Sequence, residues 1–196
     1  VTETETVQIT QTVRKTYKQQ WPQYNAAQVN EKDQFQQLLH ELCKAIETPE
    51  QEGRGGRRLP LADMVYLLIF KVYSTLSTRR FMSDLREASE RGHIGKVPHY
   101  NSIIGYLEKP ELTALLRELI TETSKPLKAV EQDFACDSSG FTTCRFARWF
   151  DHKYGVTRQQ HDWVKVHIMC GVKTNIVTAV EIKEKLAQDS PLLPAL

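Results

Sequence analysis

The stretch Phe-Ala-Cys-Asp-Ser-Ser-Gly-Phe at residues 134–141 constrains the fold more than any other part of the chain. It sets Asp137 after a short apolar run and before residues that favour turns, which predicts a strand ending at Asp137 with a turn behind it. A carboxylate presented in this way is suited to hold a metal ion. Such an aspartate can also satisfy the backbone amides of its own turn.

A two-stranded hairpin is predicted further along the chain, over residues 163–182. Apolar and polar side chains alternate in its first arm, so that Val166 and Ile168 are expected on the core face and Lys165 and His167 on the opposite face. The tripeptide Lys-Thr-Asn supplies the turn between the two arms.

A helix start is predicted at Asp-Ser-Pro, residues 189–191, because an acid or hydroxyl cap followed by proline is typical of the first helical turn. We therefore expect Asp189 to be a helix cap rather than a catalytic acid. The chain is expected to stop within this helix, as a fragment would.

The composition indicates a globular protein but names no partner. A length of 196 residues with a hydrophobic content of 40% is sufficient for a buried core. The formal net charge of +2 is close to neutral, so nucleic-acid binding depends on local clusters of basic residues. The four cysteines lack the paired spacing of zinc sites, and the sequence predicts neither a secretory leader nor a membrane span. We expect free thiols in a reducing cytoplasm.

The N-terminal part of the chain has the pattern of a helical bundle. Residues 1–20 are polar without an apolar period, which predicts a flexible arm, and residues 51–58 form a glycine-rich basic linker. Residues 61–76 are apolar almost all round, which predicts the buried central helix. Short helices with tight Gly and Pro turns favour a bundle of the helix-turn-helix type. The expected helices begin near Asn25 and after Pro60, at Ser77, and after Pro98 and Pro110, the first ending before Pro49.

Five blocks of sequence, taken together, resemble the DDE-type transposases of bacterial and archaeal insertion sequences. Several blocks in the same order are more specific than any one of them, and the resemblance spans residues 21–196. The blocks are Arg-Arg-Phe-Met-Ser-Asp-Leu-Arg-Glu-Ala at residues 79–88, Val-Pro-His-Tyr-Asn-Ser-Ile at 97–103, Asp-Ser-Ser-Gly-Phe at 137–141, Trp-Val-Lys-Val-His at 163–167 and Lys-Thr-Asn-Ile-Val-Thr-Ala-Val at 173–180.

The resemblance implies an α+β protein with two parts after the polar arm of residues 1–20. Residues 21–128 would form a helical, helix-turn-helix-like bundle that binds DNA. Residues 129–196 would form the incomplete first half of a ribonuclease-H-like α/β catalytic domain. In that family three acidic residues hold two divalent metal ions, and the first of them carries over to Asp137.

The activity implied is metal-dependent DNA cleavage and strand transfer at the ends of an insertion element, with Mg²⁺ or Mn²⁺ as the cofactor. Two metal ions stabilise the attacking and leaving oxygens of such a reaction, and one carboxylate cannot organise both. The second and third acids are expected downstream of this sequence, so we expect no activity from this chain as it stands. The resemblance also implies a homo-oligomer when complete, located in the cytoplasm and associated with the nucleoid when bound to DNA.

A different class of function stays open beside this one. The chain can be a non-catalytic DNA-binding or dimerising remnant, or a regulator of transposition that occupies element ends. Both hypotheses require a surface that grips phosphates. Basic residues interleaved with aromatic ones, or placed in the linker and on helix surfaces, are the candidates for it. They are Arg54, Arg57, Arg58, Arg79, Arg80, Arg145, Arg148, Lys153, Arg158, Lys165 and His167, with His99, Asn101 and Ser102 beside the helical arginines.

Overall fold

The computed structural model describes residues 20–50, 56, 58–142, 153–155, 163–184, 186–188 and 191. In this part of the chain, five α-helices and a short 3₁₀ helix precede a three-stranded antiparallel sheet, which confirms the α+β class. The helices are α1 (Trp21–Cys43), α2 (Leu61–Ser74), α3 (Thr78–Glu90), α4 (Tyr100–Leu107) and α5 (Leu112–Ser124), followed by the 3₁₀ helix η1 (Lys125–Leu127). The strands are β1 (Phe134–Thr142), β2 (Trp163–Gly171) and β3 (Val177–Glu184).

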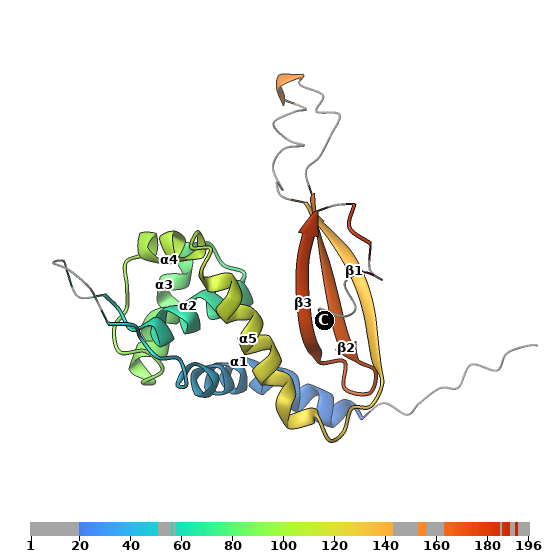
Figure 1. Ribbon diagram of the computed structural model, residues 1–196. Coiled ribbons are helices and arrows are strands. Elements are labelled where there is room, and N and C mark those ends of the chain that lie inside the picture. The colour runs from blue at the N-terminus through green and yellow to red at the C-terminus, as the bar shows by residue number, and fades with distance from the viewer. Residues whose placement is uncertain are drawn as a thin grey trace, which may run out of the picture.

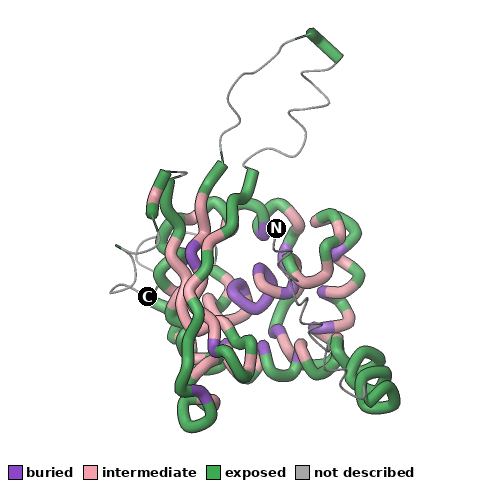
Figure 2. Tube along the Cα trace, turned by 90° about the vertical axis from the view of Figure 1, so that its right-hand side faces the viewer, coloured by how far each residue is buried: buried purple, intermediate pink, exposed green. Residues whose placement is uncertain are grey.

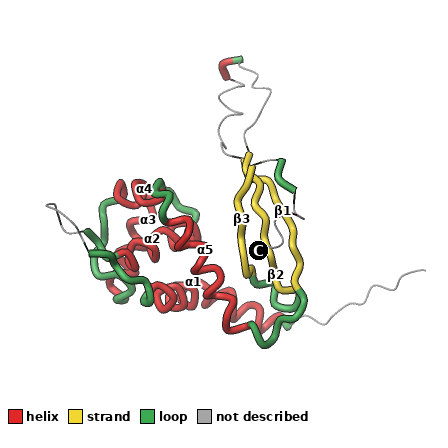
Figure 3. The backbone as a smooth tube through the Cα atoms, in the orientation of Figure 1, coloured by secondary structure: helices red, strands yellow, loops and turns green. Residues whose placement is uncertain are grey.

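The last helix stands between the sheet and the other helices. Figure 1 shows α5 running diagonally beside the sheet, with α2, α3 and α4 clustered on its other side and α1 passing below. Figure 3 shows the same division by secondary structure, with helices in the N-terminal part and strands in the C-terminal part. Asp189 and the helix expected near it lie outside the described residues, as does the polar arm apart from Gln20.

The start of α1 differs from the sequence-based expectation. The helix begins at Trp21 rather than near Asn25, and Pro22 occupies its first turn. Proline suits this position because its fixed φ is already helical and its missing N–H has no partner within the helix. The capping pattern at Asn25 is therefore interior to the helix, and the predicted start was wrong.

Helix α2 is the centre of the core, as its apolar sequence predicts. Leu67 and Phe70 are completely buried, and Tyr66 is buried almost completely. The Phe70 ring meets Phe81 of α3 edge to face, with 5.3 Å between the ring centroids. Most of the fully buried side chains belong to α2 and α3, so these two helices organise the bundle.

A turn of three residues, 75–77, joins α2 to α3. Thr75 adopts the left-handed conformation with φ of 55°, which ends α2 sharply. Ser77 is the N-cap residue of α3, but its side chain forms no capping hydrogen bond. Gly92, with φ of 76°, follows the end of α3 as predicted.

The sheet has the order β1-β2-β3, and both neighbouring pairs are antiparallel. The predicted hairpin is confirmed, and Asn175 in its turn has a positive φ of 56°. The prediction that the first strand ends at Asp137 was wrong, because β1 continues through Ser138 and Ser139 to Thr142. Pairing with the whole length of β2 supplies hydrogen bonds that outweigh the turn preference of the serines.

The two faces of the sheet are not covered as the alternation predicted. Helix α5 packs against β3 on the face where Arg117 contacts Glu181, with the ion pair at 3.1 Å. His167 lies opposite Glu181 in the β2–β3 register, so it shares this covered face and has an exposed fraction of 0%. The other face carries Val164 and Ile182, which are exposed, and we call it the open face. Figure 2 shows the strands mostly in the colours of exposed and intermediate residues. The expected core face was therefore wrong, because α5 covers the polar row rather than the apolar one.

No helix in the described part of the chain combines the length and the apolarity needed to cross a membrane.

Candidate functional site

An arginine-rich surface lies on α3 and defines the strongest candidate site. Its sequence places Phe81 and Leu85 on one side of the helix, where both are completely buried. At the helical period, the opposite side then carries Arg79, Arg80 and Arg86, all of them exposed. The amphipathic pattern of α3 thus directs three guanidinium groups toward solvent.

Two acidic residues of α3, Asp84 and Glu87, form ion pairs with Lys32 and Arg91, whereas Glu90 is exposed at the end of the helix. Lys32 of α1 pairs with Asp84 at 3.3 Å and with Glu87 at 3.1 Å. Arg91 pairs with Glu87 and with Asp33 of α1, both at 2.6 Å. These contacts hold α3 against α1; at the helical period Arg80 lies on the side of Asp84 and Glu87, whereas Arg79 and Arg86 lie further from them.

The three exposed arginines have no carboxylate within ion-pair distance in the part of the chain that the structure describes. Positive charges without an ion pair are available to an external anion, a feature that the net charge of +2 does not reveal. Such a surface attracts a polyanion.

The start of α4 is joined to this surface by a cation–π contact. The guanidinium carbon of Arg79 lies 5.2 Å from the centroid of the Tyr100 ring. His99 caps α4, because its Nδ1 accepts the backbone N–H of Asn101 at 3.3 Å. Asn101 and Ser102 are exposed in the first turn of α4. We call the combined area the arginine surface and define it as Arg79, Arg80, Ser83, Arg86, Tyr100, Asn101 and Ser102.

The other basic candidates are dispersed or lie beyond the described residues. Arg58 is exposed at the end of the linker, and the Lys153 ammonium lies 5.4 Å from the centroid of the Tyr154 ring. The candidates outside the described residues are Arg54, Arg57, Arg145, Arg148 and Arg158.

The two hairpin candidates are not presented at an exposed surface. His167 is completely buried in the row beneath α5, so its expected exposure was wrong. Lys165 is partly buried, and its Nζ donates a hydrogen bond to the carbonyl oxygen of Ala187 at 2.7 Å. Both face away from Asp137, because adjacent residues of paired strands alternate between the two faces.

Asp137 lies in the middle of β1 on the open face of the sheet. Its side chain is exposed, and Oδ1 accepts the backbone N–H of Ser138 at 2.7 Å. Its neighbour across the register is Ile168, which is apolar. The described residues contain no group of three or more side chains suited to hold a metal ion. Asp137 thus supplies one carboxylate ligand at most, and these residues do not make a two-metal site.

The cysteines of the described part of the chain are free thiols, as predicted. Burial raises the pKa of Cys43 to about 12, with the Asp63 carboxylate adding to the shift. A thiol of this kind is neither a metal ligand nor a nucleophile at neutral pH.

Sequence reasoning singled out the arginines but did not connect them to Tyr100. Local periodicity gave no signal for this contact, because Arg79 and Tyr100 belong to different helices.

Comparison of the chain with protein-family models, with curated proteins and with solved structures found no match.

Proposed function

We propose that this chain binds duplex DNA through the arginine surface, as the DNA-binding part of a DDE-type insertion-sequence transposase. The observation that carries the proposal is the absence, within the described chain, of any carboxylate paired with Arg79, Arg80 or Arg86. Asp84 and Glu87 of the same helix pair with Lys32 and Arg91, so these arginines are left available for an external anion.

The chemistry of the arginine surface suits a nucleic acid better than a small anion. Guanidinium groups form bidentate hydrogen bonds with phosphate oxygens, and each phosphate contact releases counterions from DNA. Asn101 and Ser102 add exposed amide and hydroxyl groups next to the arginines. Side chains of these types can donate to and accept from base edges or the sugar-phosphate backbone.

The catalytic part of the proposal rests on the resemblance and on Asp137. In the proposed transposase, Asp137 would be one of the carboxylates that hold Mg²⁺ or Mn²⁺. The bound metal would stabilise charge on the attacking and leaving oxygens of the phosphodiester. The described residues do not complete such a site, so we derive no catalytic step from them.

The alternative function is a non-catalytic DNA-binding remnant or a regulator that occupies element ends. One observation favours this alternative: among the described residues, no group of side chains suited to hold a metal ion includes Asp137. Both functions use the arginine surface, and only DNA cleavage separates them.

The test is the salt dependence of binding to a linear DNA duplex. The triple variant Arg79→Ala/Arg80→Ala/Arg86→Ala should lower the slope of log affinity against log salt by about 3, close to one for each lost phosphate contact. A matched control, Lys44→Ala/Lys125→Ala/Lys128→Ala, removes the same charge from exposed positions away from the arginine surface and should leave the slope nearly unchanged.

Equal loss of affinity in the two triple variants would exclude a specific role for the arginine surface. Wild-type affinity that does not fall with salt would exclude phosphate binding altogether. Circular dichroism of each variant shows whether the bundle stays folded.

A further inference from the structure

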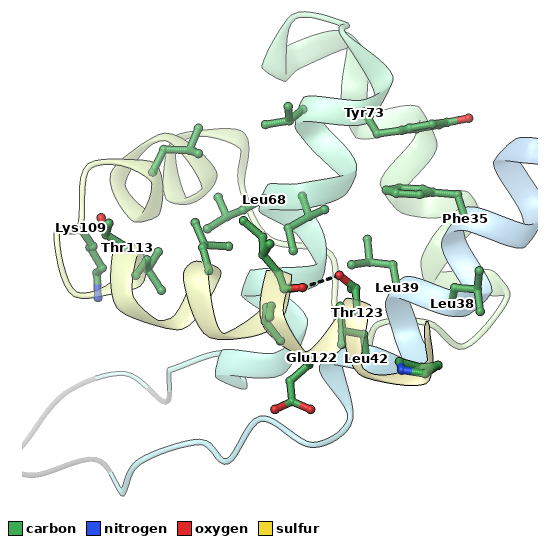
Figure 4. Close-up of a pocket in the computed structure, with 18 residues that line it drawn as sticks. Phe35, Leu38, Leu39, Leu42, Leu68, Tyr73, Lys109, Thr113, Glu122 and Thr123 are labelled. Carbon is green, nitrogen blue, oxygen red and sulfur yellow. Dashed lines mark hydrogen bonds between the residues drawn. The ribbon is translucent and has the colours of Figure 1, made fainter. Parts of the chain in front are cut away.

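All three histidines of residues 21–128 meet at the α3–α4 connection, which we define as residues 91–99. His93 and His99 belong to the connection, and the Nδ1 of His40 on α1 donates a hydrogen bond to the His93 carbonyl oxygen at 3.0 Å. An open apolar groove of about 940 Å³ runs along another side of α1, between α1 and α5, and no histidine is among the described residues that line it (Figure 4). Because histidine titrates near neutral pH, the response of the bundle to mild acid is centred on the connection.

The first half of the connection is held against the bundle by three contacts. The N–H of His93 donates to the carbonyl oxygen of Ala88 at 2.9 Å, which closes the end of α3. The N–H of Gly95 donates to the Asp63 carboxylate of α2 at 2.9 Å. Ile94, between these two residues, is buried. Together these contacts fix the path of the chain from α3 to α4.

The surroundings of the His93 ring favour its neutral form. The ring stacks on Tyr66 of α2, with 5.8 Å between the centroids, and lies 5.1 Å from the ring of His40. Burial lowers the pKa of His93 below its ordinary value, and the positive charges of His40, Arg91 and Lys44 lower it further. A proton on His93 therefore adds charge to a place that is already positive.

The carboxylates on the adjoining helices are held in other contacts. Asp63 of α2 accepts the Gly95 N–H, and Glu87 of α3 is paired with one cation of α1 and one at the end of α3. The other titratable groups of the cluster are Cys43 and Tyr66, and burial raises the pKa of both. A protonated His93 would have to compete with existing contacts for a negative partner.

His99 requires its neutral form for a different reason. Its Nδ1 accepts the N–H of Asn101 and so caps α4, which a protonated ring cannot do. The His99 ring lies 4.2 Å from the ring of Tyr100, over which the Arg79 guanidinium is placed. A positive charge on His99 would also oppose the positive end of the α4 dipole. Both ends of the connection thus depend on a neutral histidine.

We propose that protonation of His93 and His99 in mild acid releases the α3–α4 connection, so that the arginine surface binds DNA less tightly. This regulation rests on the proposed function, because it acts on the same surface. The part of the arginine surface that α4 supplies lies in the first turn of that helix, which the connection orients against Arg79. When the connection opens, this part of the surface loses its position.

The direction of the effect separates this mechanism from simple electrostatics. Additional positive charges would by themselves raise the affinity for a polyanion. Loss of the contacts made by α4 lowers the affinity. A fall of DNA affinity in acid therefore identifies a change of geometry.

Release of the connection is measured without DNA, by hydrogen exchange of the full chain from a pH of about 7.5 down to about 5.5. Protection is the factor by which the fold slows exchange, corrected for the intrinsic effect of pH. At His93 and Gly95 it is expected to fall as the pH drops below about 6.5, the ordinary histidine pKa. The fall is at most about tenfold per pH unit for each proton gained. The amide of Phe70 in α2 should keep its protection, which shows that the bundle stays folded.

The matched variant is His93→Gln/His99→Asn, in which neither side chain can gain a proton. Asparagine is a strong N-cap residue, so the start of α4 keeps its acceptor. Protection of Gly95 in this variant should not depend on pH. His40→Gln is the control, because it removes a histidine of the cluster but neither of the two that we propose as sensors. It should keep most of the response.

Binding to a linear DNA duplex is measured over the same range of pH. Wild-type affinity is expected to fall by roughly tenfold toward the acid end, and the affinity of His93→Gln/His99→Asn to stay nearly constant. A wild-type affinity that rises in acid would overturn the proposed regulation.

Three results of hydrogen exchange would overturn the release itself. They are wild-type protection that does not change with pH, a loss in His93→Gln/His99→Asn as large as in wild type, and an equal loss at Phe70. If wild type binds no DNA at any pH, the proposed function and its regulation both fail, whereas release of the connection is still decided by hydrogen exchange.

Discussion

Glu131 organises the hairpin turn that the sequence located but did not explain. Its carboxylate accepts the backbone N–H groups of Lys173 and Thr174, at 3.1 and 3.0 Å, and the Thr174 hydroxyl at 2.8 Å. Gly171 is required beside it, because a Cβ at that position would overlap the carboxylate. Nothing in the local sequence marks Glu131, since its partners lie more than forty residues away in the chain.

The Glu131 contacts make the stability of the hairpin depend on pH. Burial opposes ionisation of Glu131, but the hydrogen bonds from Lys173 and Thr174 outweigh it and hold the pKa below its ordinary value. Because the pKa of Glu131 is lower in the folded than in the unfolded protein, its ionised carboxylate stabilises the fold. This stabilisation is complete above a pH of about 4.3, the ordinary glutamate pKa. It is lost as the pH falls through the lower pKa of the folded protein.

We therefore expect the difference in unfolding free energy between wild type and Glu131→Gln to be largest near pH 7 and to shrink below pH of about 4. Urea unfolding of both proteins at several pH values measures this difference. Parallel curves for the two proteins across that range would contradict the role of the carboxylate.

Arg79 and His167 show where prediction of single residues succeeds and fails. The exposure of Arg79 follows from the helical period, which is a local property. The burial of His167 depends on which face of the sheet α5 covers, and that is a property of tertiary packing. Alternation along a strand predicts which residues share a face but not which face is covered.

Among the elements, α2 and α3 should carry most of the stability of the bundle. Phe81 is completely buried and packs edge to face on Phe70. Phe81→Ala is expected to lower the unfolding free energy by about 3–5 kcal/mol, because it removes apolar burial and leaves a cavity. Thermal or urea denaturation measures this loss.

Val29→Ala provides the matched comparison for Phe81→Ala, since Val29 is exposed on α1. Its effect should stay within about 0.5 kcal/mol, as is usual for surface substitutions. A loss of similar size in both variants would mean that the buried cluster around α2 does not dominate the stability.

The helices could be predicted because their signals are local. The apolar period located α2 to α5, and Gly and Pro residues marked the turns between them. The start of α1 and the length of β1 were mispredicted for different reasons. At α1 the cap pattern of Asn25 competed with the proline start at Pro22, and at β1 pairing with β2 overrode the preference of the serines.

For the whole molecule, the separation of the arginine surface from Asp137 predicts two independent functions. Asp137 is exposed on the open face of the sheet, so Asp137→Asn should leave the fold and the affinity for duplex DNA unchanged. In the transposase that we propose, the same substitution should abolish Mg²⁺-dependent strand cleavage. A gel-shift assay and a cleavage assay measure the two effects separately.

Cleavage retained by Asp137→Asn would remove Asp137 from the metal site and favour the non-catalytic alternative. Weakened DNA binding by the same variant would instead show that the sheet takes part in the DNA interface.

Helical segments, the hairpin and the side of α3 that carries the arginines all follow from the order of residues, because each depends on neighbours within a few positions. The cover of one sheet face by α5, the burial of His167, the clamp of Glu131 on its turn and the apolar groove beside α1 arose only on packing. They join residues that are distant in the chain, and a pattern of local periods contains no information on which distant surfaces meet.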